Sequence, residues 1–163
     1  MKMSAGFIKT ALVLMLLLTS QVMSQAVELT ADEVDRLDAL GQSLEDATVA
    51  GEYNTLLASY TEDIIISPAF RGAIRGRKAV AKIYKENRES GLRYHSIDAV
   101  TEKRWRSGNQ IFDYGAFGMA ISQSVSQKPD AYHGSYFQIW EIQSDGSFKL
   151  SYTIWNLDFN PFQ

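Results

Sequence analysis

The sequence contains no cysteine and only two histidines. The absence of cysteine excludes disulfide bonds and a cysteine nucleophile, so the fold must be stabilised by its core alone. The sequence also lacks a G-x-S-x-G motif and a glycine-rich loop that leads from a strand into a helix to hold phosphate groups. Its one long apolar run, at residues 11–18, is much shorter than the roughly 20 residues that span a bilayer. We therefore expect no cofactor and no membrane anchor.

The first 26 residues have the three parts of a signal peptide: a positively charged start, an apolar core and a small-x-small cleavage site. These parts are Lys2 and Lys9, Ala11–Leu18, and Ser24-Gln25-Ala26. Because no cysteine lies near the cut, a lipid-anchored form is excluded. We expect cleavage before Val27, which divides the chain into a signal peptide (1–26) and one domain (27–163). An exported chain without disulfides indicates a bacterial periplasm.

Basic residues are in the minority, which argues against a nucleic-acid partner, since phosphate binding needs a basic footprint. The charges are also unevenly distributed. Residues 28–63 hold ten acids and one base, whereas residues 71–93 hold eight bases and two acids. This pattern is typical of two solvated helix faces of opposite sign that pack near each other. The alternative is a basic rim that attracts an anionic ligand.

The first half of the domain has the spacing of three helices. Thr30 and Glu33 form a capping-box pattern, and apolar residues then recur at helical spacing up to Ala47. Gly51 ends this pattern, and a second short helix is predicted to run to Tyr60. A short strand at 64–66 and a turn follow, before a third helix over 77–89 that ends at Ser90-Gly91.

From Leu92 onward the hydrophobic period changes to two, which predicts four long strands joined by turns. The predicted strands are 92–106, 109–124, 131–143 and 147–158. Three glycines, Gly115, Gly118 and Gly134, are the expected positions of bulges or curvature. The predicted fold is α+β: a cone in which three N-terminal helices pack on the concave side of a strongly curved, mainly antiparallel sheet.

Four sequence segments carry a resemblance to a known family. They are D-I-I-I-S-P, I-R-G-R-K-A-V-A-K-I-Y, G-S-Y-F-Q-I-W-E-I and D-G-S-F-K-L-S-Y-T-I-W-N. Together they resemble the SnoaL-like, ketosteroid isomerase-like branch of the nuclear transport factor 2-like superfamily, and most of all its domains of unknown function. The resemblance covers residues 34–158. It implies three helices against a curved sheet, a cavity, and a homodimer, but the superfamily includes isomerases, cyclases, dehydratases, ligand binders and dimerisation modules.

Two positions depart from the chemistry that the resemblance implies. Isomerase-like members carry a carboxylate base just before the proline of the first strand, where this sequence has Ser67. The last strand often carries an acid two residues before its tryptophan, where this sequence has Thr153. Both departures favour binding over catalysis.

The candidate catalytic residues are the two histidines, His95 and His133, because imidazole titrates near neutral pH. Either could be polarised by a nearby carboxylate, Asp98 or Asp113. The alternative is that each is a surface or hydrogen-bonded strand histidine. No metal site is expected, because no ligand-spaced motif such as H-x-x-x-H is present.

Aromatic residues are abundant on the predicted strands, and a minority are expected to line the cavity together with polar neighbours. The candidate ligand-binding residues are Tyr60, Ser67, Tyr84, Tyr114, Tyr136, Trp140, Thr153 and Trp155. Alternation places Tyr136 and Trp140 on one face of their strand and His133 and Phe137 on the other. Which face is concave stays open, because one bulge near Gly134 would exchange the two.

Three functions follow as hypotheses. The first is an exported domain that binds a small hydrophobic or aromatic molecule in an aromatic-lined cavity without turnover. The second is a small isomerase, lyase or cyclase that acts on a hydrophobic carbonyl compound, with a histidine base and a tyrosine as oxyanion donor. The third is a homodimerisation module whose pocket is vestigial.

Overall fold

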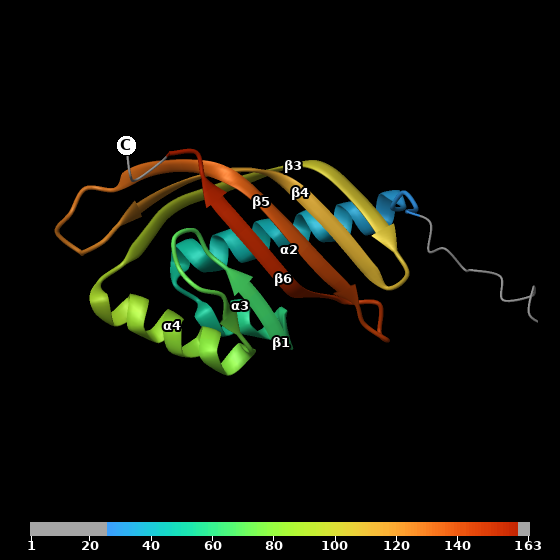
Figure 1. Ribbon diagram of the computed structural model, residues 1–163, viewed down its shortest axis with the longest axis horizontal. Helices are drawn as coiled ribbons and strands as arrows, with labels where there is room; N and C mark the ends of the chain where they lie inside the picture. Colours follow the sequence, from blue (N-terminus) through green and yellow to red (C-terminus); the bar gives the residue numbers. More distant parts are fainter. Residues whose placement is uncertain (1–25, 160–163) are drawn as a thin grey trace, which may run out of the picture.

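The computed structural model describes residues 26–159 and consists of three helices and one six-stranded sheet (Figure 1). The elements in chain order are α2 (Ala31–Ala50), α3 (Tyr53–Ala58), β1 (Tyr60–Ser67), β2 (Ile74–Arg75), α4 (Arg77–Ser90), β3 (Arg93–Ser107), β4 (Gln110–Ser122), β5 (Asp130–Ile142) and β6 (Phe148–Leu157). The predicted signal peptide, apart from Ala26, lies outside the described residues. No helix between residues 26 and 159 is long and apolar enough to cross a membrane.

The sheet is mixed and mostly antiparallel, with the strand order β2-β1-β6-β5-β4-β3. Only β1 and β6 pair in parallel; every other neighbouring pair is antiparallel. The predicted α+β class, the three N-terminal helices and the four long strands are therefore confirmed. The helices lie on one face of this sheet, and α2 runs diagonally across the long strands (Figure 1).

Helix α2 begins where the sequence predicted. The amide of Glu33 donates to the hydroxyl of Thr30 at 3.2 Å, and the amide of Thr30 donates back to the Glu33 carboxylate at 3.0 Å. Gly51 ends the helix in the left-handed conformation, with φ of 70°, which glycine adopts without steric cost.

Removal of the Thr30 hydroxyl gives a first testable prediction. Because this hydroxyl satisfies an orphan amide of the first turn, Thr30→Ala should lower the free energy of unfolding by about 1 kcal/mol. Ser43→Ala is the control, since Ser43 is exposed within the same helix and caps nothing. Urea unfolding should show the loss in the first variant only; equal midpoints for the two variants would contradict this account of the cap.

One boundary prediction was wrong. Tyr60 was expected on the second helix, but α3 ends at Ala58 and Tyr60 is the first residue of β1. The amide of Leu150 donates to the carbonyl of Ser59 at 2.9 Å, and Tyr60 then pairs with Leu150 in the parallel ladder. The first strand therefore begins at Tyr60, whereas the sequence predicted that it begins at Ile64.

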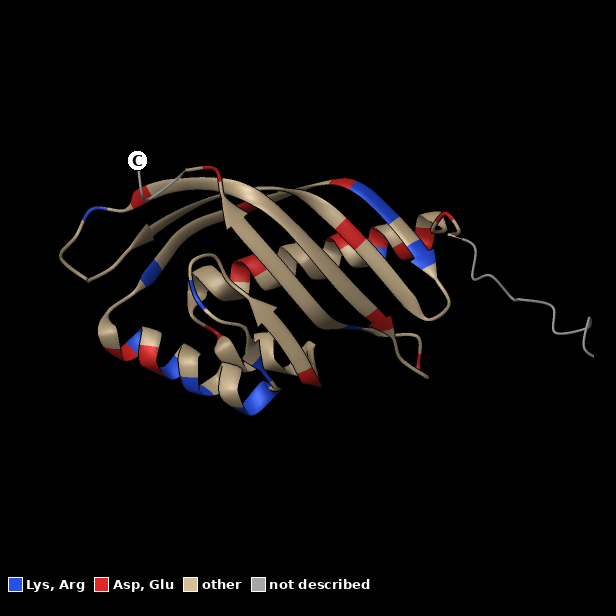
Figure 2. Ribbon diagram, in the orientation of Figure 1, with Lys and Arg blue, Asp and Glu red and all other residues tan. Residues whose placement is uncertain are grey.

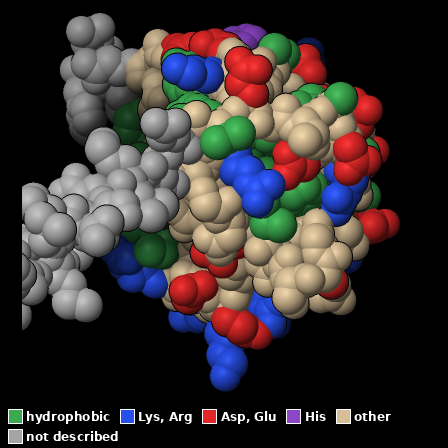
Figure 3. All heavy atoms as spheres, turned by 90° about the vertical axis from the view of Figure 1, so that its right-hand side faces the viewer, with side chains coloured by type: hydrophobic (Ala, Val, Ile, Leu, Met, Phe, Trp, Pro, Cys, Tyr) green, Lys and Arg blue, Asp and Glu red, His purple; other side chains and the backbone are tan. Residues whose placement is uncertain are grey.

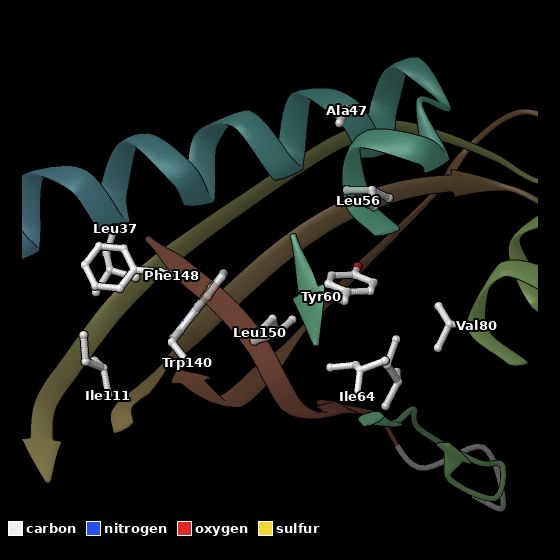
Figure 4. Packing of buried hydrophobic residues seen from close by; sticks show 11 residues of the cluster. Leu37, Ala47, Leu56, Tyr60, Ile64, Val80, Ile111, Trp140, Phe148 and Leu150 are labelled. Carbon is white, nitrogen blue, oxygen red and sulfur yellow. The ribbon is translucent and has the colours of Figure 1, made fainter. Parts of the chain in front are cut away.

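The core lies between the helices and the inner face of the sheet (Figure 4). Leu37 from α2 meets Trp140 and Phe148 from the long strands, and Ile64 from β1 packs below α4 with Val80. Each of these side chains is almost fully buried. This packing holds α2 and α4 over the sheet and so determines the space left between them.

Among the described residues, one ion pair joins the two charged segments, that between Glu62 and Arg77. Acids of α2 pair with β3, as Glu33 does with Arg106 at 2.7 Å, whereas Arg77 of α4 pairs with Glu62 of β1. Four more residues of the basic segment, Lys78, Lys82, Lys85 and Arg88, lie along α4 (Figure 2), where Lys82 and Lys85 pair with acids four residues on. At the end of the molecule near the start of α2, acidic and basic side chains are intermixed (Figure 3).

Candidate functional site

A cavity of about 590 Å³ lies between α2 and the inner face of the long strands. Its walls come from all three helices and from β1 and β3 to β6, so the cavity exists only when helices and sheet are assembled. Seven aromatic residues contribute to its lining: Tyr60, Tyr84, Tyr94, Phe117, Tyr136, Trp140 and Trp155. Its size is within the range of about 300–1,000 Å³ that small-molecule sites occupy.

The structure resolves which face of the sheet is turned to the helices. Tyr136 and Trp140 of β5 both line the cavity, as the alternation predicted, and Gln138 between them lines it as well. The pairing of β5 with β4 and β6 has no register shift near Gly134, so the two faces are not exchanged there. Phe137 lies on the opposite face and packs with Phe112 at 6.2 Å between ring centroids.

A polar cluster centred on Asp113 occupies one part of the cavity wall. Asp113 is only 3% exposed. Its Oδ2 accepts hydrogen bonds from Nε and Nη2 of Arg104 at 3.0 and 2.7 Å. Its Oδ1 accepts from the hydroxyls of Thr101 and Tyr136 at 3.1 and 3.3 Å. The carboxylate therefore accepts four hydrogen bonds, which compensates for its burial.

A β-bulge brings Thr101 into this cluster. Residues 101 and 104 would normally point to opposite faces of a strand, but the register of β3 against β4 shifts between Thr101 and Lys103. The extra residue turns Thr101 to the same side as Arg104, and Nη2 of Arg104 donates to its hydroxyl at 3.0 Å. Gly115 pairs with Thr101 at this point, so a bulge does occur beside Gly115, but its extra residue, Glu102, belongs to the partner strand β3. No register shift accompanies Gly118 or Gly134.

Sequence reasoning missed the pairing of Arg104 with Asp113, although a signal was present. The hairpin at Ser107-Gly108 sets the register of β3 and β4, and counting back from the pair Ser107–Gln110 places Arg104 opposite Asp113. The same counting continues across the sheet, where Asp113 pairs with Gln138 and Gln138 with Thr153. A row of polar residues thus crosses the cavity floor.

A group of tyrosines forms the wall on the α4 side. The hydroxyls of Tyr60 and Tyr84 are 2.7 Å apart, and the ring of Tyr84 stacks on Tyr53 with 4.9 Å between centroids. Tyr84 also borders a second hollow of about 590 Å³ between α3 and α4. Burial raises the pKa of Tyr60 to about 12, and burial is also the main cause that raises the pKa of Tyr84.

The raised pKa of Tyr60 predicts a loss of stability at high pH. Free tyrosine titrates near pH 10, so between pH 10 and 12 the unfolded chain releases this proton while the folded chain retains it. The stabilisation is therefore complete below pH 10 and is lost as the pH rises through 12, by at most about 1.4 kcal/mol per pH unit from this group.

Urea unfolding at pH 8 and pH 11 checks this prediction. Tyr60→Phe should remove part of the decrease in unfolding free energy between the two pH values. Tyr114→Phe is the control, because Tyr114 is 39% exposed. An equal decrease in wild type and in Tyr60→Phe would contradict the assignment.

Six of the eight candidate ligand-binding residues line the same cavity: Tyr60, Tyr84, Tyr136, Trp140, Thr153 and Trp155. Tyr114 does not, because it follows Asp113 in β4 and therefore points to the opposite face of the sheet. Ser67, the last residue of β1, is not among the lining residues either.

Neither candidate catalytic histidine is brought to the cavity. His95 is exposed on β3, and its Nε2 lies 3.0 Å from the hydroxyl of Ser122. His133 is exposed on β5 beside Gly118, on the face turned away from the helices. No group of three or more potential metal ligands is present between residues 26 and 159.

No protein-family model matches the sequence, and no curated protein matches it. Solved structures do match. A ketosteroid isomerase-like protein from Erwinia carotovora atroseptica superimposes with a TM-score of 0.69 at 14% identity, covering 80% of this chain and 100% of the other. A putative dehydratase from the NTF2-like family of Streptomyces avermitilis gives 0.65 at 12% identity, covering 80% and 100%.

A third match is a protein of unknown function with a cystatin-like fold from Nostoc punctiforme, with a TM-score of 0.62 at 14% identity, covering 84% of this chain and 100% of the other. At these identities the matches establish the fold alone. The chain thus has the ketosteroid isomerase-like, NTF2-like fold that the resemblance implied, and that fold is shared by proteins of different and unknown function.

Proposed function

We propose that this chain binds a small hydrophobic or aromatic molecule in the cavity between α2 and the sheet, without converting it. The observation that carries the proposal is the cavity itself: about 590 Å³, lined by aromatic side chains, crossed by the polar row of the sheet and bordered by polar residues of α2, namely Asp38, Gln42, Glu45 and Thr48. An apolar wall with few, localised polar groups is the usual composition of a small-molecule site. Gln138 in that row makes no side-chain hydrogen bond with another described residue, so its amide is available to a ligand.

The same geometry argues against proton transfer as the main function. Asp113 is the one carboxylate buried in the cavity wall, and all four of its hydrogen bonds come from protein donors. A general base needs a lone pair directed at the substrate, whereas those of Asp113 are occupied. The two histidines lie outside the cavity.

The alternative is an isomerase, lyase or cyclase that acts on a hydrophobic carbonyl compound. The observation that favours it is the hydroxyl of Tyr136, which lies in the cavity wall beside Asp113. Burial raises the pKa of Tyr136 to about 12, so at neutral pH this hydroxyl stays protonated and can donate to a carbonyl oxygen. This alternative needs a base other than His95 or His133.

We also propose that the domain is an exported homodimer. No described helix covers the outer face of the sheet, where Trp105 stacks on Phe112, Phe137 packs against both at a tilt, and Ile154 is 42% exposed. An apolar sheet face of this kind suits a second copy of the chain. We further propose that the register shifts in the pairing of the long strands, between Tyr94 and Ser96, between Thr101 and Lys103, and between Ile139 and Trp140, bend the sheet into a cone whose concave side holds the cavity.

Native mass spectrometry of the protein purified from its own cells tests these proposals together. The expected spectrum shows a dimer whose chains begin at Val27 and retain a small molecule that is released on unfolding. A titration with 1-naphthol, followed by tryptophan fluorescence, should saturate at one molecule per chain, because Trp140 and Trp155 line the cavity. A ligand-free spectrum together with no saturable binding would overturn the binding proposal, and conversion of the retained molecule would favour the alternative.

A further inference from the structure

We propose that two neighbouring side chains on the cavity floor, Gln138 and Thr153, bind an amide group of the ligand, so that the ligand is a neutral aromatic lactam or carboxamide. This inference rests on the proposed binding function and adds the chemical class of the ligand to it. Gln138 of β5 and Thr153 of β6 are register partners, and both line the cavity. Directly opposed residues on one face of an antiparallel pair have Cβ atoms about 4.5–5.5 Å apart, so one ligand group can reach both side chains.

The hydroxyl of Thr153 is buried but has no partner within the protein. Thr153 is only 8% exposed, and its hydroxyl forms no hydrogen bond with another residue between 26 and 159. In the same range, only Thr61 and Trp140 have an unpaired side-chain nitrogen or oxygen that is also fully enclosed. The hydroxyl of Thr153 is therefore unpaired and still reachable from the cavity. Because buried polar groups are normally paired, this hydroxyl indicates a partner supplied by a ligand.

The amide of Gln138 is likewise unpaired. Gln138 is partly buried, and its side chain forms no hydrogen bond with another described residue. Two polar side chains of α2 in the same lining are, by contrast, paired within their helix. The hydroxyl of Thr48 donates to the carbonyl of Leu44 at 2.7 Å, and the amide of Gln42 donates to Asp46 at 3.1 Å. The cavity floor thus presents an unpaired amide and an unpaired hydroxyl side by side.

The charges beside this pair favour a neutral ligand group. Arg104 is the only cation among the described residues that line the cavity, and it donates to Asp113 through Nε and Nη2 and to Asp38 through Nη1. Asp113 is the register partner of Gln138 on its other side. A ligand carboxylate bound to Gln138 would therefore lie beside a negative charge and find no free positive one.

An amide complements the pair better than a group that only accepts hydrogen bonds. A glutamine amide and a threonine hydroxyl can each donate and accept. In the proposed arrangement, the ligand N–H donates to the side-chain carbonyl of Gln138, and the hydroxyl of Thr153 donates to the ligand carbonyl. A ketone or ester could take the second hydrogen bond only, and it would leave the carbonyl oxygen of Gln138 without a donor.

Aromatic rings lie on both sides of the pair. Tyr136 and Trp140 are the residues two before and two after Gln138 on the same face of β5, and Trp155 follows Thr153 by two on β6. All three line the cavity. The body that carries the amide would therefore lie among aromatic side chains, which suits a planar aromatic ring and strengthens the hydrogen bonds by excluding water.

Two isomers test the preference for an amide: 3-methylquinolin-2(1H)-one and 1-methylquinolin-2(1H)-one. They share their size and their carbonyl group, but the second carries its methyl group on nitrogen and so has no N–H. Calorimetric titration at pH 7 should show the 3-methyl isomer binding about 10-fold more tightly, and 2-naphthoic acid, which is anionic at that pH, binding most weakly.

Equal affinities of the two isomers, or tightest binding of the acid, would overturn this inference and leave the binding function standing. A retained molecule without an amide group would do the same. If none of these probes binds, 1-naphthol does not bind and no molecule is retained, the binding function itself fails, and this inference with it.

Two variants assign the hydrogen bonds to the proposed residues. Gln138→Met should reduce the affinity ratio of the two isomers to within about 3-fold, because the acceptor of the ligand N–H is gone. Thr153→Val should weaken both isomers about 10-fold and leave their ratio unchanged, because both keep the carbonyl. Neither variant should lower the melting temperature, since neither removed group pairs with the described protein.

Asn156→Leu is the matched control, because it removes an amide from an exposed position of β6 outside the cavity lining. It should leave both affinities unchanged. A ratio that survives Gln138→Met, affinities that survive Thr153→Val, or equal losses in the control would overturn the assignment to these two residues.

Discussion

Replacing Asp113 by leucine should lower the free energy of unfolding by about 3 kcal/mol. The substitution removes the acceptor of four hydrogen bonds and leaves the guanidinium of Arg104, whose side chain is 10% exposed, without its buried partner. Breaking one side of a buried ion pair typically costs about 3–5 kcal/mol. The lower end applies here, because Asp38 still pairs with Arg104 at 2.9 Å.

Asp38→Leu provides the matched control for this variant. It removes the other carboxylate from the same guanidinium, but the side chain of Asp38 is 59% exposed, so the loss should stay within about 1 kcal/mol. Adding Arg104→Leu to Asp113→Leu should restore part of the stability, because it removes the stranded charge. Urea unfolding measures all four proteins. Equal effects of the two aspartate substitutions would show that burial of the cluster is not what makes Asp113 important.

The second large effect is expected at Gly115. A Cβ at this position would lie 2.1 Å from the carbonyl oxygen of Val100 and 2.9 Å from the hydroxyl of Tyr136. The carbonyl oxygen of Val100 belongs to the backbone beside the bulge of β3, so it cannot move without disturbing the pairing of β3 with β4. Gly115→Ala should therefore cost about 3 kcal/mol, at the upper end for overpacking, and displace Tyr136 from Asp113.

Gly118→Ala is the control on the same strand. Its Cβ would meet only the ring of His133, at 3.3 Å, and that side chain is exposed and free to turn. The effect on the melting temperature should be small there and large at Gly115. The reverse order would show that the approach of β3 to Gly115 is not a constraint on the fold.

The sequence was sufficient to predict the elements but not the composition of the site. The period-two pattern placed the four long strands within about two residues of their bounds, because each strand has one face turned to the core. The cavity-lining aromatics followed from the same alternation. Alternation could not predict which of the two faces is turned to the helices, because a shift in the register between paired strands would exchange the faces.

The polar cluster needed information that local patterns do not carry. Thr101 reaches Asp113 only through the bulge after it, and the position of a bulge is set by contacts across the strand pair. Arg104 was overlooked because an arginine on a strand is usually solvent-exposed, although its register partner could have been counted from the hairpin. Tyr60 was assigned to a helix because its spacing from Leu56 fits one; only its pairing with Leu150 makes it a strand residue.

The measurement that tests the central claim most directly is a comparison of two phenylalanine substitutions on α2. Gly41 lines the cavity, and a Cβ added there has no atom within 4 Å, so Gly41→Phe would place a ring in the open space. Ala39→Phe adds the same ring on the exposed side of the helix. Calorimetric titration with 1-naphthol should show binding at least about 10-fold weaker in Gly41→Phe and unchanged in Ala39→Phe, with both proteins folded. Undiminished binding to Gly41→Phe would contradict the account, because the ligand would then occupy a site other than this cavity.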